Sequence, residues 1–411
     1  MPPEPRIQVL SPRTWGKFGN YLAATSFSRV LRERVAAEVA LGEAEPLVPL
    51  LGEAGAEIRV ISEESPDLAT RNARYRGLME RLQERFPQGF EEDPTPAQAA
   101  VLSGLTAHLR ETSPDVVVGT KGFLARLCVA AVRLAGTPTK VVSQVTNPGL
   151  LQIPLHRSRF PDLTLVGFEW AARRLLADEG GDPARVRVVG PLVAQHDLRE
   201  FMTGPAATAD TAPGTASGAA PWGADDDDPD RPRLIVFCNR GGEVYLRLLE
   251  RIAADHPSVD LVFVGYDDPG LARRAAGSAG RQRHWRFHSR LTQTEYFDYI
   301  DRAARSAHGL LVSKAGPNTT LEAAYFGIPV LMLESGLPME EWVPGLIHEH
   351  ALGRACSAPD ELLRTADDWL SRPESIARHK KSAIGFASRV LDQDTVATRI
   401  GAAVGSLLEE R

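Results

Sequence analysis

The stretch SKAGPNTTLEAAYFGIPVLML, residues 313–333, places a glycine-containing turn between an apolar segment and a short helical pattern. Thr319 and Glu322 match the S/T-x-x-E capping box, in which both side chains satisfy backbone N–H groups at a helix start. Gly327 predicts the end of that helix, and Pro329 prevents its continuation. The same turn is also consistent with a ligand cradle, because a glycine turn after a strand and a helix N-terminus favour anion binding.

Strand and helix patterns alternate on both sides of this stretch. Helical spacing of apolar residues occurs, for example, at 20–40 and 123–136, and a long helical tail is predicted at 373–410. The predicted strands are 6–11, 57–62, 115–120, 139–146, 163–167 and 186–191 in the first half, and 233–238, 260–266, 284–289, 309–313 and 328–333 in the second. Such alternation predicts an α/β protein with doubly wound parallel sheets.

A low-complexity segment, residues 203–232, interrupts this alternation. It is rich in Ala, Gly, Pro and Thr and ends in an acidic run, so it predicts a disordered linker rather than a metal site. The sequence therefore predicts two Rossmann-like domains, 1–202 and 233–385, and a C-terminal helix, 386–411, that can pack back on the first domain. A cleft where strand ends of the two domains face each other is the default ligand site.

Composition narrows the class of protein. The 411 residues hold 47 Lys+Arg against 53 Asp+Glu, a formal net charge of -6, which does not favour a nucleic-acid partner. The three cysteines lack C-x-x-C spacing, so neither a disulfide framework nor a zinc site is predicted. No secretory signal or membrane-spanning run is recognised, which favours a cytoplasmic protein, with peripheral contact to the inner face of the membrane left open.

A second glycine-bearing loop lies at the start of the second domain. CNRGGEVY, residues 238–245, follows the first strand of that domain and opens a helix with Gly241 and Gly242. It is interpreted either as a flexible strand-to-helix turn or as a phosphate-binding loop. Because both this loop and the 313–333 stretch follow strands of one parallel sheet, two helix N-termini are predicted to face one diphosphate.

These residues carry a resemblance to a known family. SKAGPNTTLEAAYFGIPVLM (313–332) followed by LPMEEWVPGLIHEHALGRAC (337–356) resembles the donor-binding half of monogalactosyldiacylglycerol synthases and processive diacylglycerol glucosyltransferases, in glycosyltransferase family 28. A looser likeness extends to the peptidoglycan transferase that adds GlcNAc to a lipid carrier. The matching positions are Lys314, Ala315, Gly316, Pro317, Thr319, Glu322 and Ala323.

The resemblance implies a GT-B glycosyltransferase, with two doubly wound domains facing a central cleft and a UDP-sugar held mainly by the second domain. By position, Glu322 would bind the ribose hydroxyls. The diphosphate would be lined by Gly241, Gly242, Gly316, Pro317, Asn318 and Thr319; the uracil by Phe287, His288 and Leu291; and the sugar hydroxyls by Glu340 and Glu341. The family needs neither a metal in the donor site nor a cofactor beyond the UDP-sugar co-substrate.

The acceptor side departs from the family pattern. In GKFGNYLAAT (16–25), Asn20 stands where the family has a histidine, and an amide cannot take a proton, so Asn20 is interpreted as a helix cap or an acceptor-orienting group. Lys121 lies near a position that is His in some members. His156 is the first choice for the base, because an unperturbed imidazole titrates near neutral pH. Its surroundings, residues 145–160, predict an acceptor pocket, a membrane-docking segment or a core loop.

The sequence thus favours an inverting glycosyltransferase that moves a sugar from a UDP-sugar to a hydroxyl or amine of a lipid or secondary-metabolite acceptor. Two alternatives remain open: a nucleotide-sugar 2-epimerase, and a UDP-sugar-binding protein with impaired catalysis. The oligomeric state is not indicated by any pattern.

Overall fold

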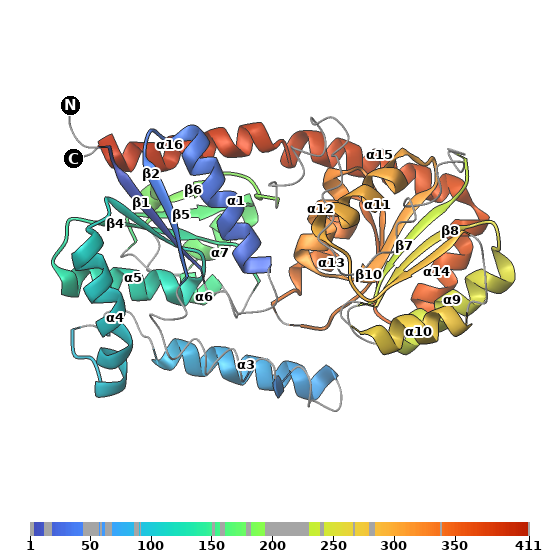
Figure 1. Ribbon diagram of the computed structural model, residues 1–411, viewed down its shortest axis with the longest axis horizontal. Helices are drawn as coiled ribbons and strands as arrows, with labels where there is room; N and C mark the ends of the chain where they lie inside the picture. Colours follow the sequence, from blue (N-terminus) through green and yellow to red (C-terminus); the bar gives the residue numbers. More distant parts are fainter. Residues whose placement is uncertain are drawn as a thin grey trace, which may run out of the picture. The chain divides into compact units, whose positions relative to one another are not determined.

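The computed structural model divides the chain into two compact units, which are described separately (Figure 1). Unit 1 comprises Met1–Ala194, Gly336–Trp342 and Leu391–Arg411, and unit 2 comprises Gln195–Ser335 and Val343–Val390. The structure describes residues 4–11, 19–43, 57, 60–61, 68–85, 90, 92–149, 153–156, 161–177, 182–193, 230–238, 242–265, 268–278, 284–337 and 339–409. Of the predicted linker, 203–232, residues 203–229 lie outside this description.

The described part of unit 1 contains a parallel sheet with the strand order β2-β1-β3-β4-β5-β6. Its strands are β1 (Arg6–Ser11), β2 (Glu38–Glu43), β3 (Val116–Gly119), β4 (Lys140–Gln144), β5 (Leu163–Val166) and β6 (Val186–Val188). In β1, Ile7 pairs in register with Val39 on one side and Val116 on the other. All four residues of β3 are buried, as expected for a parallel strand covered on both faces.

Helices cover both faces of this sheet. On one face α1 and α16 pack together over β1, β2 and β3, with Phe27 and Ile400 in one apolar cluster. On the other face α3, α4 and α5 form a second cluster that includes Tyr75 and Phe123. The helices are α1 (Gly19–Arg34), α3 (Leu68–Arg85), α4 (Pro96–Thr112), α5 (Gly122–Ala135), α6 (Ile153–His156), α7 (Glu169–Leu176) and α16 (Gln393–Glu409), with a 3₁₀ turn at Pro183–Arg185.

The described part of unit 2 also contains a parallel sheet, with the order β12-β11-β10-β7-β8-β9. Its strands are β7 (Arg233–Phe237), β8 (Asp260–Val264), β9 (Trp285–His288), β10 (Gly309–Lys314), β11 (Val330–Leu333) and β12 (Gly353–Cys356). The order reverses between β7 and β10, because the chain runs from β7 to β8 on one side and from β10 to β11 on the other. In open α/β sheets, ligands bind outside the carboxyl ends of the strands at such a reversal.

The helices of unit 2 also lie on both faces of its sheet, as Figure 1 shows. On one face α9, α10 and α14 bury Tyr245 and Trp369 against the strands, while α11 and α12 lie opposite and α15 contacts both α12 and α14. The helices are α9 (Gly242–Asp255), α10 (Pro269–Ser278), α11 (Gln293–Arg305), α12 (Pro317–Tyr325), α13 (Trp342–Glu349), α14 (Pro359–Ser371) and α15 (Pro373–Val390). No described helix of the chain is both long and apolar enough to cross a bilayer.

The predicted doubly wound parallel sheets are confirmed, with two corrections to the strands. The strand predicted at 57–62 is wrong, because Glu57, Val60 and Ile61 are helical. The second strand of unit 1 is instead β2, which overlaps the end of the helix predicted at 20–40. The edge strand β12 was not predicted at all. Both missed strands lie at an edge of their sheet, and their pairing is decided by the neighbouring strand and not by a long apolar run.

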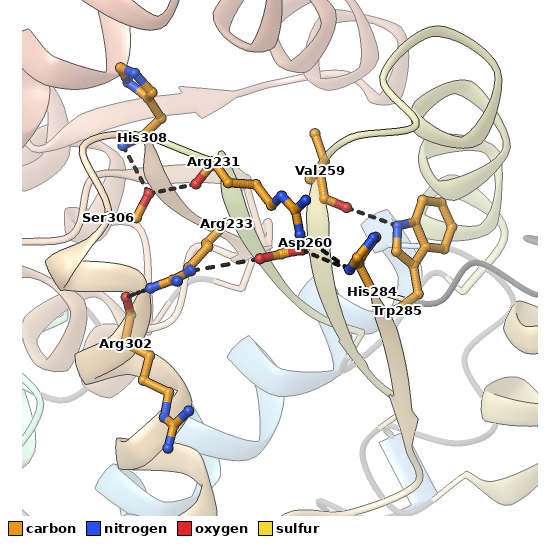
Figure 2. Close-up of polar contacts among 9 residues, drawn as sticks. All are labelled: Arg231, Arg233, Val259, Asp260, His284, Trp285, Arg302, Ser306 and His308. Carbon is orange, nitrogen blue, oxygen red and sulfur yellow. Dashed lines mark hydrogen bonds and ion pairs between the residues drawn. The ribbon is translucent and has the colours of Figure 1, made fainter. Parts of the chain in front are cut away.

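A buried charge network ties together the amino ends of β7, β8 and β9 (Figure 2). Asp260, the first residue of β8, is 1% exposed, and its Oδ1 lies 3.3 Å from Nη1 of Arg231. Its Oδ2 lies 3.8 Å from Nε of Arg233, and its Oδ1 lies 3.8 Å from Nδ1 of His284. The Ser306 hydroxyl donates to the Arg231 carbonyl at 2.8 Å. Because this network is at the end of the sheet opposite the ligand-binding end, we assign it to stability.

Candidate functional site

The turn that opens α12 lies at the carboxyl end of β10. Gly316 is the N-cap residue and Pro317 is the first helical residue, and no side-chain hydrogen bond caps the helix within the described residues. The predicted capping box is therefore wrong, because Thr319 is already the third helical residue. Gly327 ends the helix with a φ of +74°, as predicted. Among the described residues, the N–H groups of Asn318 and Thr319 therefore have no side-chain acceptor at the helix start, which is the arrangement that binds anions.

Glu322 follows one turn later on α12 and is half-buried. Its Oε2 accepts a hydrogen bond from the Tyr296 hydroxyl of α11 at 2.5 Å. The Tyr296 ring meets the Phe237 ring, at the end of β7, with its edge at 5.0 Å between centroids. Burial raises the pKa of Glu322, and the hydrogen bond from Tyr296 opposes that rise. A carboxylate is thus held at the carboxyl ends of β7 and β10, where the strand order reverses.

Lys314, the last residue of β10, adds a positive charge to this turn. A Cβ placed on Gly316 would be 3.5 Å from the Lys314 Nζ, so the ammonium lies beside the start of α12. An ammonium and a helix N-terminus both favour a negatively charged group. Lys314 was not among the predicted binding residues, although it belongs to the K-A-G-P motif. Tyr296 was also missed, and no sequence signal links it to Glu322, 26 positions away.

The other predicted diphosphate loop is described only in part. Gly241 lies outside the described residues, and Gly242 is the first residue of α9. A Cβ on Gly242 would lie 2.9 Å from Cδ1 of Leu271, so glycine here lets α9 approach α10 closely. This packing explains Gly242 without a ligand, and its role in diphosphate binding stays a prediction.

The residues predicted to hold uracil lie at the end of β9 and just after it. The ring of Phe287 packs against two aromatic rings of the unit 2 core, each 6.3 Å away. His288 Nε2 lies 3.1 Å from the Tyr299 hydroxyl, and burial lowers the pKa of His288. Leu291 is half-buried before α11. Since both rings are engaged within unit 2, a base at this edge would be read chiefly by backbone groups, and this role stays a prediction.

Glu340 and Glu341, predicted to contact sugar hydroxyls, lie in Gly336–Trp342, a segment that belongs to unit 1. Oε1 of Glu341 is 3.2 Å from Nη1 of Arg174, and the Arg174 guanidinium lies 4.8 Å from the Trp170 ring centroid. Binding a sugar through Glu341 would compete with this ion pair. The predicted role of both glutamates is untested, and the contacts of Glu341 do not support it.

The same segment is anchored to unit 1 by an aromatic cluster. The Trp342 ring lies 5.7 Å from the Phe168 ring and 5.6 Å from the Trp170 ring, centroid to centroid. The Trp342 indole N–H donates to Oδ1 of Asn147 at 3.0 Å. A Cβ on Gly149 would lie 2.3 Å from the carbonyl oxygen of Met339, so glycine is required for this close approach.

The first-choice base, His156, is on α6 and only 3% exposed. Its Nδ1 lies 3.0 Å from the Ser143 hydroxyl oxygen. Burial, followed by repulsion from Lys121 and Arg126, lowers the pKa of His156 to about 3. The prediction assumed an unperturbed imidazole on a loop, and both premises are wrong. A buried imidazole with so low a pKa is a weak base, so its predicted role is not supported.

Lys121 is the N-cap residue of α5, two positions after the end of β3, and its side chain makes no capping hydrogen bond. It is 9% exposed, and burial lowers the pKa of its amine to about 8. The strand order of unit 1 reverses between β1 and β3, so Lys121 lies where this sheet would bind a ligand. Asn20 is the second residue of α1, after the cap position; its side chain, and residues 150–152 and 157–160 of the predicted acceptor segment, lie outside the description.

Two doubly wound parallel sheets of this kind define the GT-B fold. Solved structures superpose on this chain along nearly its whole length, and their low sequence identities show the shared fold alone. A provisionally assigned UDP-N-acetylglucosamine 2-epimerase from Listeria monocytogenes superposes with a TM-score of 0.62 and 15% identity, covering 100% of this chain and 98% of that one. MurG from Acinetobacter baumannii gives 0.54 and 14%, covering 100% of both chains. Phytolacca americana UGT2, complexed with UDP-2fluoro-glucose and pterostilbene, gives 0.57 and 14%, covering 98% and 99%.

Comparison by sequence gives more specific relatives. No family model matches the chain. The UDP-N-acetylglucosamine–N-acetylmuramyl-(pentapeptide) pyrophosphoryl-undecaprenol N-acetylglucosamine transferase of Nocardioides sp. is 28% identical over 234 residues, 57% of this chain. The match spans only 56% of that protein's length. The transferase of the same name from Clavibacter michiganensis subsp. michiganensis is 26% identical over 319 residues, 74% of this chain and 76% of that protein. A specific likeness to monogalactosyldiacylglycerol synthases does not emerge from these relatives.

Proposed function

We propose that this chain is an inverting glycosyltransferase that moves a sugar from a UDP-sugar to a hydroxyl or amine acceptor. The observation that carries the proposal is the start of α12, where no described side chain caps the helix, beside Lys314 and the half-buried Glu322. This site lies where the strand order of unit 2 reverses. The relatives found by sequence, transferases that use UDP-N-acetylglucosamine by name, support the same reading.

In this proposal the residues of unit 2 hold the donor and stabilise the leaving group. The N–H groups of Asn318 and Thr319 and the Lys314 ammonium would bind the diphosphate as negative charge develops on it. Glu322 would accept hydrogen bonds from the ribose. The scheme assigns stabilisation of the diphosphate to these groups and includes no divalent cation and no cofactor besides the co-substrate.

On the acceptor side, Lys121 is the candidate base. The acceptor oxygen or nitrogen attacks the anomeric carbon from the face opposite UDP, its proton passes to the neutral Lys121 amine, and the bond to UDP breaks with its electron pair leaving on the diphosphate. An amine whose pKa is about 8 is partly neutral near physiological pH, which a base requires. Asn20 remains a candidate for orienting the acceptor.

The names of the sequence relatives suggest which substrates to try first. Their donor is UDP-N-acetylglucosamine and their acceptor is a pyrophosphoryl-undecaprenol lipid, so we propose a lipid-linked acceptor and, for residues 145–160, a peripheral membrane contact. A secondary metabolite is the other acceptor class, because the family histidine is absent at Asn20.

The test begins with a panel of UDP-sugars in a thermal-shift assay. The donor that stabilises the protein most is then incubated with lipid and soluble acceptors while UDP release is measured. Acceptor-dependent UDP release and an inverted anomeric linkage by NMR are the expected results. A 2-epimerase, the second candidate suggested by the Listeria monocytogenes structure, would convert UDP-N-acetylglucosamine to its 2-epimer without acceptor. Binding with neither reaction would indicate a UDP-sugar-binding protein.

A further inference from the structure

The Tyr296 hydroxyl contacts the carboxylate of Glu322, a residue of the proposed nucleotide site. The hydroxyl donates to Oε2 of Glu322 at 2.5 Å, a charge-assisted hydrogen bond between α11 and α12. The ring is fixed from the other side by Phe237, 5.0 Å away at the end of β7. Both Tyr296 and Glu322 are half-buried, so the pair reaches solvent at the carboxyl end of the sheet and is not sealed in the core.

This contact restricts the carboxylate of Glu322. A glutamate side chain on the surface of a helix samples several rotamers, and holding one of its oxygens removes most of that freedom before a ligand arrives. Each carboxylate oxygen has two lone-pair positions, so the group keeps acceptor capacity after the bond from Tyr296 is made. A ligand hydroxyl is the chemistry that fits the remaining capacity.

We propose that Tyr296 is a positioning residue for the nucleotide, which holds the Glu322 carboxylate so that it accepts a hydrogen bond from a ribose hydroxyl. The inference rests on the proposed function, in which Glu322 contacts the ribose. In this inference, a residue of α11, outside the K-A-G-P motif, helps the site to bind ribonucleotides in preference to deoxyribonucleotides.

The experiment compares UDP, 2′-deoxy-UDP and 3′-deoxy-UDP by isothermal titration calorimetry with the full-length protein. In the wild-type protein, one deoxy analogue is expected to bind about tenfold more weakly than UDP, the effect of losing one hydrogen bond to a charged group. Tyr296→Phe is expected to weaken UDP several-fold and to reduce the preference for UDP over that analogue. Combined with Glu322→Ala, it should add almost nothing, because Glu322→Ala already removes the carboxylate that Tyr296 orients.

Tyr245→Phe is the matched control. Tyr245 is also in unit 2, and its buried hydroxyl has no hydrogen-bond partner among the described residues, so the change should leave all three affinities unaltered. If Tyr296→Phe keeps the wild-type preference for UDP over the deoxy analogue and shows only a lower melting temperature, the hydroxyl merely stabilises the fold. Equal binding of all three nucleotides by the wild-type protein would also overturn the inference. Failure of the wild-type protein to bind UDP at all would instead count against the proposed function itself.

Discussion

Replacing Lys121 by Met should make the protein more stable at neutral pH while lowering its turnover. The Lys121 amine is 9% exposed, and no acidic side chain contributes to its pKa, which burial lowers from 10.5 to about 8. In the unfolded chain the amine is solvated and holds its proton more tightly. At pH 7 the folded state therefore carries a protonated, poorly solvated amine, which Met does not have.

The size of the effect follows from the two pKa values. The pKa values of the unfolded and folded states differ by about 2.5, which corresponds to about 3 kcal/mol of unfolding free energy. Because the folded-state pKa is the lower of the two, the charged amine destabilises the folded state fully below pH 8. This penalty diminishes as pH rises from 8 to 10.5, because only the unfolded state then binds the proton. The gain from Lys121→Met should accordingly fall to about 1 kcal/mol at pH 10.

Urea denaturation of the wild-type protein and Lys121→Met, followed by circular dichroism at pH 7 and pH 10, measures this difference. Lys381→Met, which alters an exposed lysine of α15, is the matched control and should give no comparable gain. A gain of the same size at both pH values would refute the reasoning, because it would come from apolar packing and not from the buried charge.

Four other outcomes are expected. Glu322→Ala should weaken UDP binding about tenfold by calorimetry with little change in melting temperature, because no capping box is lost; the reverse pattern would favour a structural role. Lys121→Met should lower turnover about 100-fold while UDP-sugar affinity is kept, and normal turnover would place the base elsewhere. Asp260→Asn should destabilise the protein by about 3 to 5 kcal/mol in urea, since the buried Arg233 and the half-buried Arg231 then face no carboxylate; a change below 1 kcal/mol would contradict this. Deleting residues 206–229 should leave UDP affinity unchanged by calorimetry, and a large loss would show that the segment contributes to the site.

The sequence predicts the central strands and the α12 turn because their signals are local. Strand β3 is a run of valines, and the glycine turn before α12 is a local signal, although the helix starts at Pro317 and not at the predicted Thr319 cap. Strand β12, with the sequence GRAC, carries no comparable run, and its pairing depends on the neighbouring β11. Contacts formed by folding are equally invisible in the sequence: the hydrogen bond from Tyr296 to Glu322, the burial that lowers the pKa of His156, and the ion pair of Glu341 with Arg174 all join residues distant in sequence or depend on packing.

The assembly of unit 1 from three separate pieces of chain has a consequence for biosynthesis. Val396, Ile400 and Val404 of α16 cover one face of its sheet, yet they emerge from the ribosome only after the whole of unit 2. Until then the nascent first 194 residues expose apolar surface that has nothing to pack against, a state prone to aggregation. Unit 1 should therefore mature after translation ends, and a fragment stopping at residue 194 should be captured by chaperones or degraded where the full chain is not.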